Sequence, residues 1–229
     1  MTRRLGVLGG TFDPIHFGHL DAAAAAHEAL GLDEVLFMPS HDPPHRAMDP
    51  HATAFQRFAL IAIAINTCTI ACRVSDEELR RQGNSYTSDT LRALHAAGWS
   101  PWQIFFILGA DAFAEIATWH EFPAVLDAAH FAVIARPGAS IGEALRRTPG
   151  LRSRVRPVAA ATRERGETGV FLIEADTRDV SSTIIRGRLA ARQSIDDLVP
   201  PPVARHIAAH HLYGAEDGLH GNNQIKTRT

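Results

Sequence analysis

The chain has 229 residues, 45% of them hydrophobic, and a formal net charge of −2 at pH 7. We expect one large domain over residues 1–213 and a polar, flexible tail over residues 214–229. The near-neutral charge excludes the strongly basic face of a sequence-independent nucleic-acid binder. Two cysteines, no signal peptide and no apolar run of about 20 residues favour a cytoplasmic protein that does not enter a membrane.

Apolar, strand-like runs alternate with helix-like segments along the chain, which is typical of βαβ units and a parallel sheet. Strands are predicted at residues 4–9, 34–40, 70–75, 103–109, 130–138 and 169–175, and helices at residues 18–30, 52–65, 88–98, 112–129, 181–191 and 201–213. Thr87 or Ser88 is expected to cap the first turn of the helix over residues 88–98. An arginine-rich helix and loop, read as a solvated insertion, is expected over residues 143–165. We therefore predict a Rossmann-like, doubly wound α/β fold: a mostly parallel sheet with helices on both faces and a small helical C-terminal part.

The segment GGTFDPIHFGHL, residues 9–20, lies between the first predicted strand and the first helix. In open parallel sheets ligands bind at the carboxyl ends of the strands, beside helix N-termini, where partial positive charge stabilises phosphate. Gly9 and Gly10 lack Cβ atoms, so the backbone can approach a phosphate there. His16 and His19 are three apart and share one helix face. A nucleotide phosphate site is predicted, and an ordinary turn with two exposed histidines is the alternative.

A second anion site is indicated by SSTIIR, residues 181–186, at the start of a predicted helix. Its hydroxyls and first-turn N–H groups can bind anions, and Arg186 lies on the same face and can grip a phosphate. A capped helix with a solvated arginine is the alternative. The dinucleotide fingerprint G-x-G-x-x-G and the Walker pattern are both absent.

Taken together, GGTFDPIHFGHL, SDEELRRQGNSYTSDTL, FFILGADAFAEIATWHEF, FAVIARPG, VSSTIIRGRL and LVPPPVARHIAAHHLY resemble the bacterial nicotinate-nucleotide adenylyltransferases. The H-x-G-H and SSTIIR elements alone would indicate only the wider nucleotidyltransferase superfamily, which includes class I aminoacyl-tRNA synthetases. GNSYTSDTL and ATWHEF narrow the resemblance to this family. It covers nearly the whole chain except residues 139–169 and the tail.

The resemblance implies adenylyl transfer from ATP to nicotinate mononucleotide, giving deamido-NAD and pyrophosphate, with Mg²⁺ carried mainly by ATP and no protein metal site. It assigns catalysis to His16, His19 and Arg186. The implied ATP site comprises Gly9, Gly10, Thr11, Phe12, His16, His19, Gly109, Asp111, Ser181, Ser182, Thr183 and Arg186. The acceptor's phosphate, already anionic, would attack the α-phosphorus in line, so that positioning and charge stabilisation supply the catalysis.

The acceptor site implied by the resemblance comprises His45, Arg46, Tyr86, Thr87, Asp111, Trp119 and Arg136. In this reading the amides at Tyr86 and Thr87 bind the nicotinate carboxylate, and Asp111 contacts the ribose. Trp119 is either a stacking face for the pyridine ring or a plug in the core. Asp111 also suits a helix cap, and Arg136 a plain surface position.

One position departs from the family pattern. PPHR at residues 43–46 matches a family Pro-Pro-His-Lys, so Arg46 replaces a lysine that reaches the phosphates. Lys226 is the only lysine of the chain, and arginine and lysine are not equivalent at a tight phosphate site. The role of Arg46 is therefore open.

Two other readings compete with the main one: another enzyme of the superfamily, such as pantetheine-phosphate adenylyltransferase or a cytidylyltransferase, and a non-catalytic nucleotide sensor on the same fold. The family elements disfavour the first, and retention of the histidines and Arg186 disfavours the second. Cys68 and Cys72 are expected to be a small buried pair, and His206, His210 and His211 a packed or solvated helix face. Homo-oligomerisation is left open.

Overall fold

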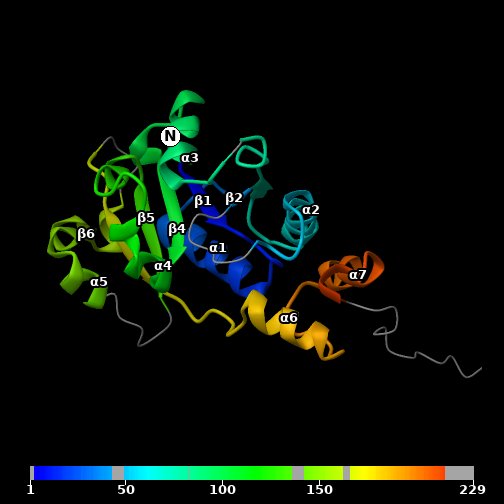
Figure 1. Cartoon of the computed structure of the whole chain (residues 1–229). Coiled ribbons are helices and arrows are strands. Elements are labelled where there is room, and N and C mark those ends of the chain that lie inside the picture. The colour runs from blue at the N-terminus through cyan, green and yellow to red at the C-terminus, as the bar shows by residue number, and fades with distance from the viewer. Residues whose placement is uncertain (1–2, 43–48, 82, 136–141, 162–165, 215–229) are drawn as a thin grey trace, which may run out of the picture.

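A single seven-stranded parallel sheet forms the centre of the protein (Figure 1). This computed structural model describes residues 3–42, 49–81, 83–135, 142–161 and 166–214. In the sheet the strands follow the order β3-β2-β1-β4-β5-β7-β6, and every pair is parallel. Their bounds are β1 Leu5–Gly10, β2 Glu34–Pro39, β3 Cys72–Val74, β4 Ile104–Gly109, β5 His130–Ala135, β6 Val155–Arg156 and β7 Val170–Glu174. The predicted doubly wound α/β fold is confirmed.

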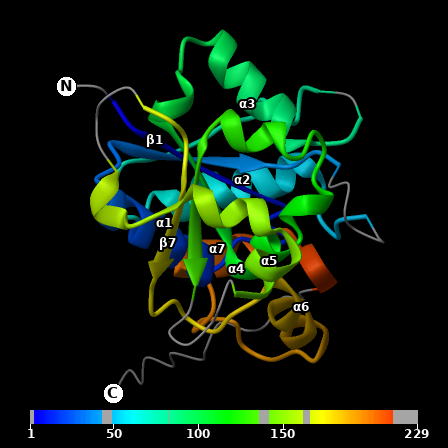
Figure 2. The same cartoon turned by 90° about the vertical axis from the view of Figure 1, so that its left-hand side faces the viewer.

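The chain builds the sheet outward from β1 twice, first to β2 and β3, and then from β4 on the other side of β1. The direction of winding therefore reverses between β1 and β4, which pair in the register Leu5 to Ile104. The strand arrowheads point toward the end of the molecule at which α6 (Ser182–Ala190) lies (Figures 1 and 2). A reversal at the carboxyl ends of parallel strands leaves a crevice for a ligand.

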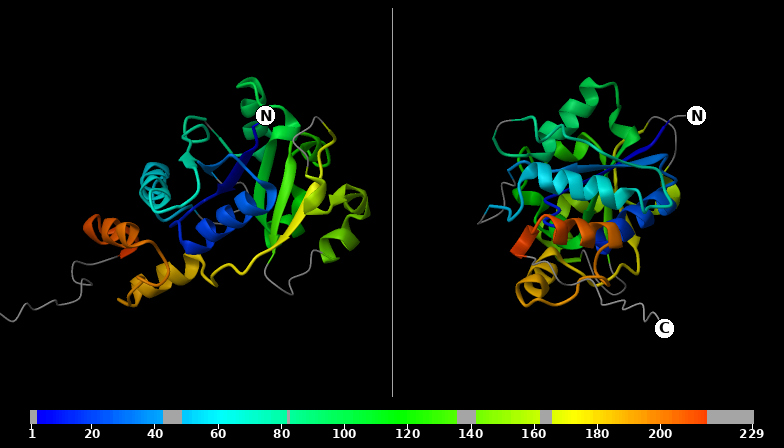
Figure 3. Two further views of the ribbon diagram at one scale, coloured as in Figure 1. Left: turned by 180° about the vertical axis from the view of Figure 1, so that it is seen from behind. Right: turned by 90° about the vertical axis from the view of Figure 1, so that its right-hand side faces the viewer.

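Helices cover both faces of the sheet. One face packs against α1, α2, α6 and α7, and the other against α3, α4, α5 and short 3₁₀ turns. Beyond α6 their bounds are α1 Phe17–Leu30, α2 Ala54–Ile65, α3 Thr87–Ala96, α4 Ala110–Ala114, α5 Gly142–Arg147 and α7 Pro201–Ala209. α7 lies beside α2, and α6 contacts the 3₁₀ turn Leu212–Gly214 that follows α7 (Figure 3). Alternate residues of the buried strands feed the two cores, as the period of two in a strand requires.

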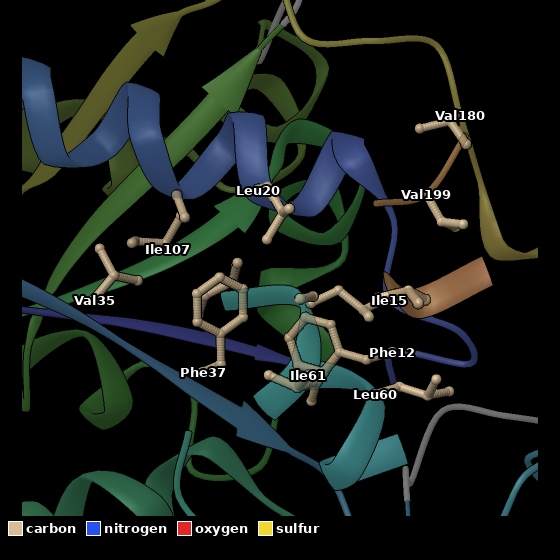
Figure 4. Packing of buried hydrophobic residues seen from close by; sticks show 14 of the residues in the cluster. Phe12, Ile15, Leu20, Val35, Phe37, Leu60, Ile61, Ile107, Val180 and Val199 are labelled. Atoms are coloured by element: carbon tan, nitrogen blue, oxygen red, sulfur yellow. The ribbon is translucent and has the colours of Figure 1, made fainter. Parts of the chain in front are cut away.

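The loop after β1 is anchored by two apolar side chains that enter the core between α1 and α2 (Figure 4). Phe12 and Ile15 are almost completely buried, and the Phe12 ring lies 5.9 Å from the ring of Phe37 on β2. Close packing in such a core leaves little room for a shift of the backbone. The loop therefore presents the residues that follow Ile15 from a rigid base.

Three local predictions are wrong. The helix expected over residues 112–129 ends at Ala114 and gives way to 3₁₀ turns. A continuous helix through residue 129 is also incompatible with the positive φ of 62° at Glu121 and with Pro123, which cannot donate a helical hydrogen bond. The arginine-rich segment contains the edge strand β6 and a buried Leu151, so it is not a solvated insertion throughout. Neither Thr87 nor Ser88 caps α3, whose N-cap is Tyr86.

No helix among the described residues combines the length and the apolar character needed to cross a bilayer. Cys68 and Cys72 are free thiols that are half-buried rather than fully buried. The rings of His206 and His210 lie 4.2 Å apart on α7, and no group of three metal-ligating side chains occurs in the described part of the chain.

We predict that Ile15→Ala lowers the free energy of unfolding by about 2–5 kcal/mol, because it leaves a cavity under the loop after β1. Urea unfolding of both proteins at pH 7 measures the difference. Ile184→Ala is the matched control: Ile184 is 44% exposed, so its truncation should change the free energy by less than about 0.5 kcal/mol. Equal effects of the two substitutions would contradict the anchoring role.

Candidate active site

A cleft of about 690 Å³ opens at the reversal point between β1 and β4. The ends of β1, β4 and β5, the start of α1, the start of α4 and the segment before α6 line this cleft. The lining residues are Leu8, Gly9, His16, Gly18, His19, Ala22, Leu108, Gly109, Ala110, Asp111, Ala112, Ile134, Thr177, Arg178, Asp179 and Val180. Five residues that the sequence assigned to ATP therefore share one cavity: Gly9, His16, His19, Gly109 and Asp111.

The two histidines form a stacked pair at the start of α1. Their ring centroids are 3.7 Å apart with an interplanar angle of 25°. His16 is the N-cap residue of the helix, and its backbone N–H donates to Nδ1 of His19 at 3.2 Å. Because Nδ1 of His19 accepts this bond, a neutral ring carries its proton on Nε2. His19 is thus held in the tautomer that offers Nε2–H as a donor.

Both imidazoles are neutral near pH 7. Burial lowers the pKa of His16 to about 4, and the Asp21 carboxylate opposes that shift only in part. Burial also lowers the pKa of His19 well below its ordinary value, and neighbouring His16 lowers it further. The pair therefore offers neutral N–H dipoles rather than two fixed cations, and its role as donors to developing phosphate charge stays a prediction.

Gly18, between the two histidines, had no role in the sequence analysis. A Cβ atom there would lie 3.2 Å from Nδ1 of His16, 3.2 Å from a Val180 methyl and 3.3 Å from the carbonyl oxygen of Arg178. A side chain would therefore push the segment before α6 away from α1. The signal was present, since a glycine in the first turn of a helix is unfavourable unless close packing requires it.

α6 is docked onto the same loop after β1. Ser182 Oγ donates to the carbonyl oxygen of Pro14 at 2.8 Å, and Arg186 Nη1 donates to that of Asp13 at 2.6 Å. Ser181 Oγ accepts from the N–H of Ile184 as the helix cap. Ser182 uses its hydroxyl proton on Pro14, whereas the Ser181 hydroxyl only accepts in its bond and can still donate. The anion donors of α6 are therefore the Ser181 hydroxyl, backbone N–H groups at the start of the helix and the guanidinium of Arg186.

Asp13 lies beneath this contact and is fully buried. Its Oδ2 accepts from the N–H of His51 at 2.9 Å and its Oδ1 from that of Ala52 at 3.1 Å. Burial alone would raise the pKa of Asp13, but these amides, helped by Tyr213 and Arg186, hold it below the ordinary value. A buried carboxylate thus joins the loop after β1 to the entry of α2.

The predicted acceptor segments also meet each other. The Tyr86 ring, at the N-cap of α3, stacks on His120 with centroids 4.3 Å apart, and Ser88 Oγ lies 3.1 Å from His120 Nδ1. Arg92 bonds both carboxylate oxygens of Glu121. These contacts hold NSYT and WHEF together, and sequence reasoning did not assign roles to Ser88 and His120, although WHEF was among the quoted elements.

Trp119 combines the two alternatives left open by the sequence. It packs edge-to-face against Phe106 and Phe131 and is only half-buried, so one side of the indole is anchored in the core. A Cβ atom at Gly9 would lie 2.9 Å from the Phe106 ring. Phe106 therefore lies between the cleft glycine and the tryptophan.

Other predicted site residues fall into three groups. Asp111 is exposed in the cleft but is not a helix cap, because Gly109 is the N-cap of α4. The Phe12 ring is buried in the core and Gly10 packs against it, so only the backbone of Phe12 is available to a nucleotide. His45, Arg46 and Arg136 lie outside the described residues.

Comparisons with known proteins show the family of the chain and support its fold. A family model described as cytidylyltransferase-like matches residues 7–188. The chain is 40% identical over 214 residues to a probable nicotinate-nucleotide adenylyltransferase of Trichlorobacter lovleyi, covering 92% of this chain and 99% of the relative. It is 38% identical over 218 residues to the protein of that name from Pseudomonas aeruginosa, covering 94% and 99%. The structure of Plasmodium falciparum nicotinic acid mononucleotide adenylyltransferase complexed with NaAD shares the fold, with a TM-score of 0.70, 18% identity and coverage of 93% and 98%.

We predict that stability falls as the pH drops below 6.5, because unfolded His16 gains a proton near its ordinary pKa of 6.5 while folded His16 resists protonation down to about 4. Between pH 7 and pH 5 this contributes a loss of about 2 kcal/mol. Urea unfolding at both pH values measures it. The loss should shrink by that amount in His16→Gln, and an unchanged pH dependence in that variant would show that His16 is not buried as a neutral ring.

Proposed function

The chain belongs to the cytidylyltransferase-like nucleotidyltransferases and, within them, to the nicotinate-nucleotide adenylyltransferases, and on that premise we propose that it transfers the adenylyl group of ATP to nicotinate mononucleotide. The products are deamido-NAD and pyrophosphate. The observation that supports this most directly is the neutral, stacked His16–His19 pair in a cleft at the reversal point of the sheet. A phosphoryl transfer needs such fixed donors more than it needs a base.

In this proposal the acceptor's phosphate oxygen forms a bond to the α-phosphorus of ATP as the bond to the bridging oxygen of pyrophosphate breaks. His19 Nε2–H and the His16 ring stabilise charge on the α-phosphoryl group. Arg186, held at the Asp13 carbonyl, neutralises the departing pyrophosphate together with the amides at the start of α6. The attacking phosphate is already anionic, so no side chain has to remove a proton.

The acceptor binds on the side of α3 and Trp119 in this proposal. The free indole face would stack on the positively charged pyridine ring. First-turn amides of α3 lack helical acceptors, so those near Tyr86 and Thr87 can donate to a carboxylate. Asp111, exposed in the cleft, would receive a ribose hydroxyl. Arg46 and Arg136 are proposed for the phosphates from the sequence alone.

ATP would enter as its magnesium complex. The described residues supply no cage of three metal-ligating side chains, and the triphosphate oxygens and water are the ligands that Mg²⁺ prefers. The proposed partners are thus two nucleotides. A cytoplasmic location and homo-oligomerisation stay predictions of the sequence.

We predict that the purified protein releases pyrophosphate from MgATP with nicotinate mononucleotide, and with at least about 100-fold lower kcat/KM with the amide, because the amide group turns a donor toward a donor. A coupled pyrophosphate assay with both acceptors and phosphopantetheine measures this. Release with phosphopantetheine alone would overturn the proposal, and equal use of the two pyridine nucleotides would overturn the assignment of the Tyr86 and Thr87 amides.

His19→Ala should lower kcat by about 10²–10³ while KM for ATP changes little, because a donor aimed at developing charge acts mainly in the transition state. Steady-state kinetics of the folded variant at saturating acceptor measures both constants. If kcat stays within a few-fold of wild type, His19 has a structural role only.

A further inference from the structure

We propose that Glu78 is a positioning residue that fixes the acceptor-binding amides around Tyr86 and Thr87 and thereby sets the preference for an acidic over an amide acceptor. The inference rests on the proposed function and extends it to a residue of SDEELRRQGNSYTSDTL that the sequence analysis gave no role. Glu78 lies in the segment between β3 and α3 and is 7% exposed. It is one of the few carboxylates buried in the described chain.

Glu78 lies beside the backbone amides around Tyr86 and Thr87 that are proposed to bind the acceptor's carboxylate. Thr90, which is fully buried in the first turn of α3, donates its hydroxyl to Glu78 Oε1 at 2.5 Å. The Ser85 hydroxyl lies near enough to the Glu78 carboxyl group to lower its pKa. Ser85 immediately precedes Tyr86, and Thr90 Oγ1 also lies 3.4 Å from the Tyr86 carbonyl oxygen. One carboxyl group therefore faces the chain just before Tyr86 and Thr87 and is hydrogen-bonded to it just after them.

Ser85 passes this constraint to the loop after β2. Its Oγ accepts from the N–H of His41 at 2.9 Å, and its own N–H donates to the carbonyl oxygen of Asp42 at 2.9 Å. The Ser85 hydroxyl thus accepts from His41 while it faces the Glu78 carboxyl group. Replacing that carboxyl group would change the support of Ser85 at the point where the two loops join.

The energetics favour a specific role over simple packing. Burial raises the pKa of Glu78 above its ordinary value, although the Thr90 and Ser85 hydroxyls and the Arg81 charge act in the opposite direction. An apolar side chain would fill this space without that desolvation cost. Such a side chain could not accept from the Thr90 hydroxyl or attract that of Ser85, five residues earlier, and these two contacts flank the amides of Tyr86 and Thr87.

The same geometry explains why acceptor choice would respond to Glu78. A carboxylate needs donors at both of its oxygens, and a small rotation of the peptide at Tyr86 or Thr87 removes one of them. An amide acceptor already lacks one favourable contact, so it loses less when the peptide rotates. Loosening the loop should therefore weaken the acid acceptor more than the amide.

The test uses Glu78→Gln, with Glu77→Gln as the matched control. Glu77 is exposed, and its carboxylate makes a long ion pair with Arg81, with 3.8 Å between nitrogen and oxygen. Kinetics are measured with MgATP and each pyridine mononucleotide. For Glu78→Gln we expect KM for nicotinate mononucleotide to rise about tenfold or more, the acid-to-amide ratio of kcat/KM to fall about tenfold, and KM for ATP to stay within about twofold. Glu77→Gln should match wild type.

An unchanged ratio in folded Glu78→Gln, or equal changes in KM for both substrates, would overturn the inference while leaving the proposed function intact. Wild-type protein that releases no pyrophosphate with either mononucleotide would overturn both. If Glu78→Gln does not fold, Thr90→Val and Thr90→Ser replace it: the valine variant removes the hydroxyl at nearly constant volume, and serine restores it. A lowered acid-to-amide ratio in the valine variant alone supports the inference, and equal ratios in the two overturn it.

Discussion

The loops at the carboxyl end of the sheet depend on the hydrogen bonds of one buried group, the guanidinium of Arg57. It is 1% exposed and donates to the carbonyl oxygens of Thr11, Ser40, His41 and Ala52. These carbonyls belong to the loops after β1 and β2 and to the entry of α2. A buried cation satisfied by backbone carbonyls in three segments defines their spacing, and removal of such a group would leave several acceptors without partners at once.

Main-chain acceptors and two buried carboxylates position the rest of the site. Asp13 ties the loop after β1 to the start of α2 and, through its carbonyl, to Arg186 on α6. Glu78 does the corresponding work on the acceptor side with Ser85 and Thr90. The charged groups that never touch the cleft thus determine where the uncharged histidine rings and the backbone amides point.

The fold and the centre of the site were predictable because they depend on local pattern. Apolar runs bounded by glycine and proline marked six of the strands, and His16 and His19 needed only their spacing and a preceding strand to be placed together. β6 was not predicted, because a strand of two residues in an arginine-rich segment is too short to show an alternation of apolar and polar residues. The break after Ala114 depends on the backbone at Glu121, and the burial of Glu78 depends on Thr90, a partner that only the folded chain brings into contact.

The central pairing of β1 with β4 has a consequence for how the protein is made. Leu5 and Ile104 are neighbours in the sheet although about a hundred residues separate them, so this pairing closes a large loop and is slow compared with helix formation. During synthesis Gly9, His16 and His19, which line one side of the cleft, emerge well before β4 and α4 supply the other side. α6 follows later still. A nascent chain therefore exposes the apolar sides of β1 and β2 without their partner strand, and nucleotide affinity arises only when nearly the whole chain has left the ribosome.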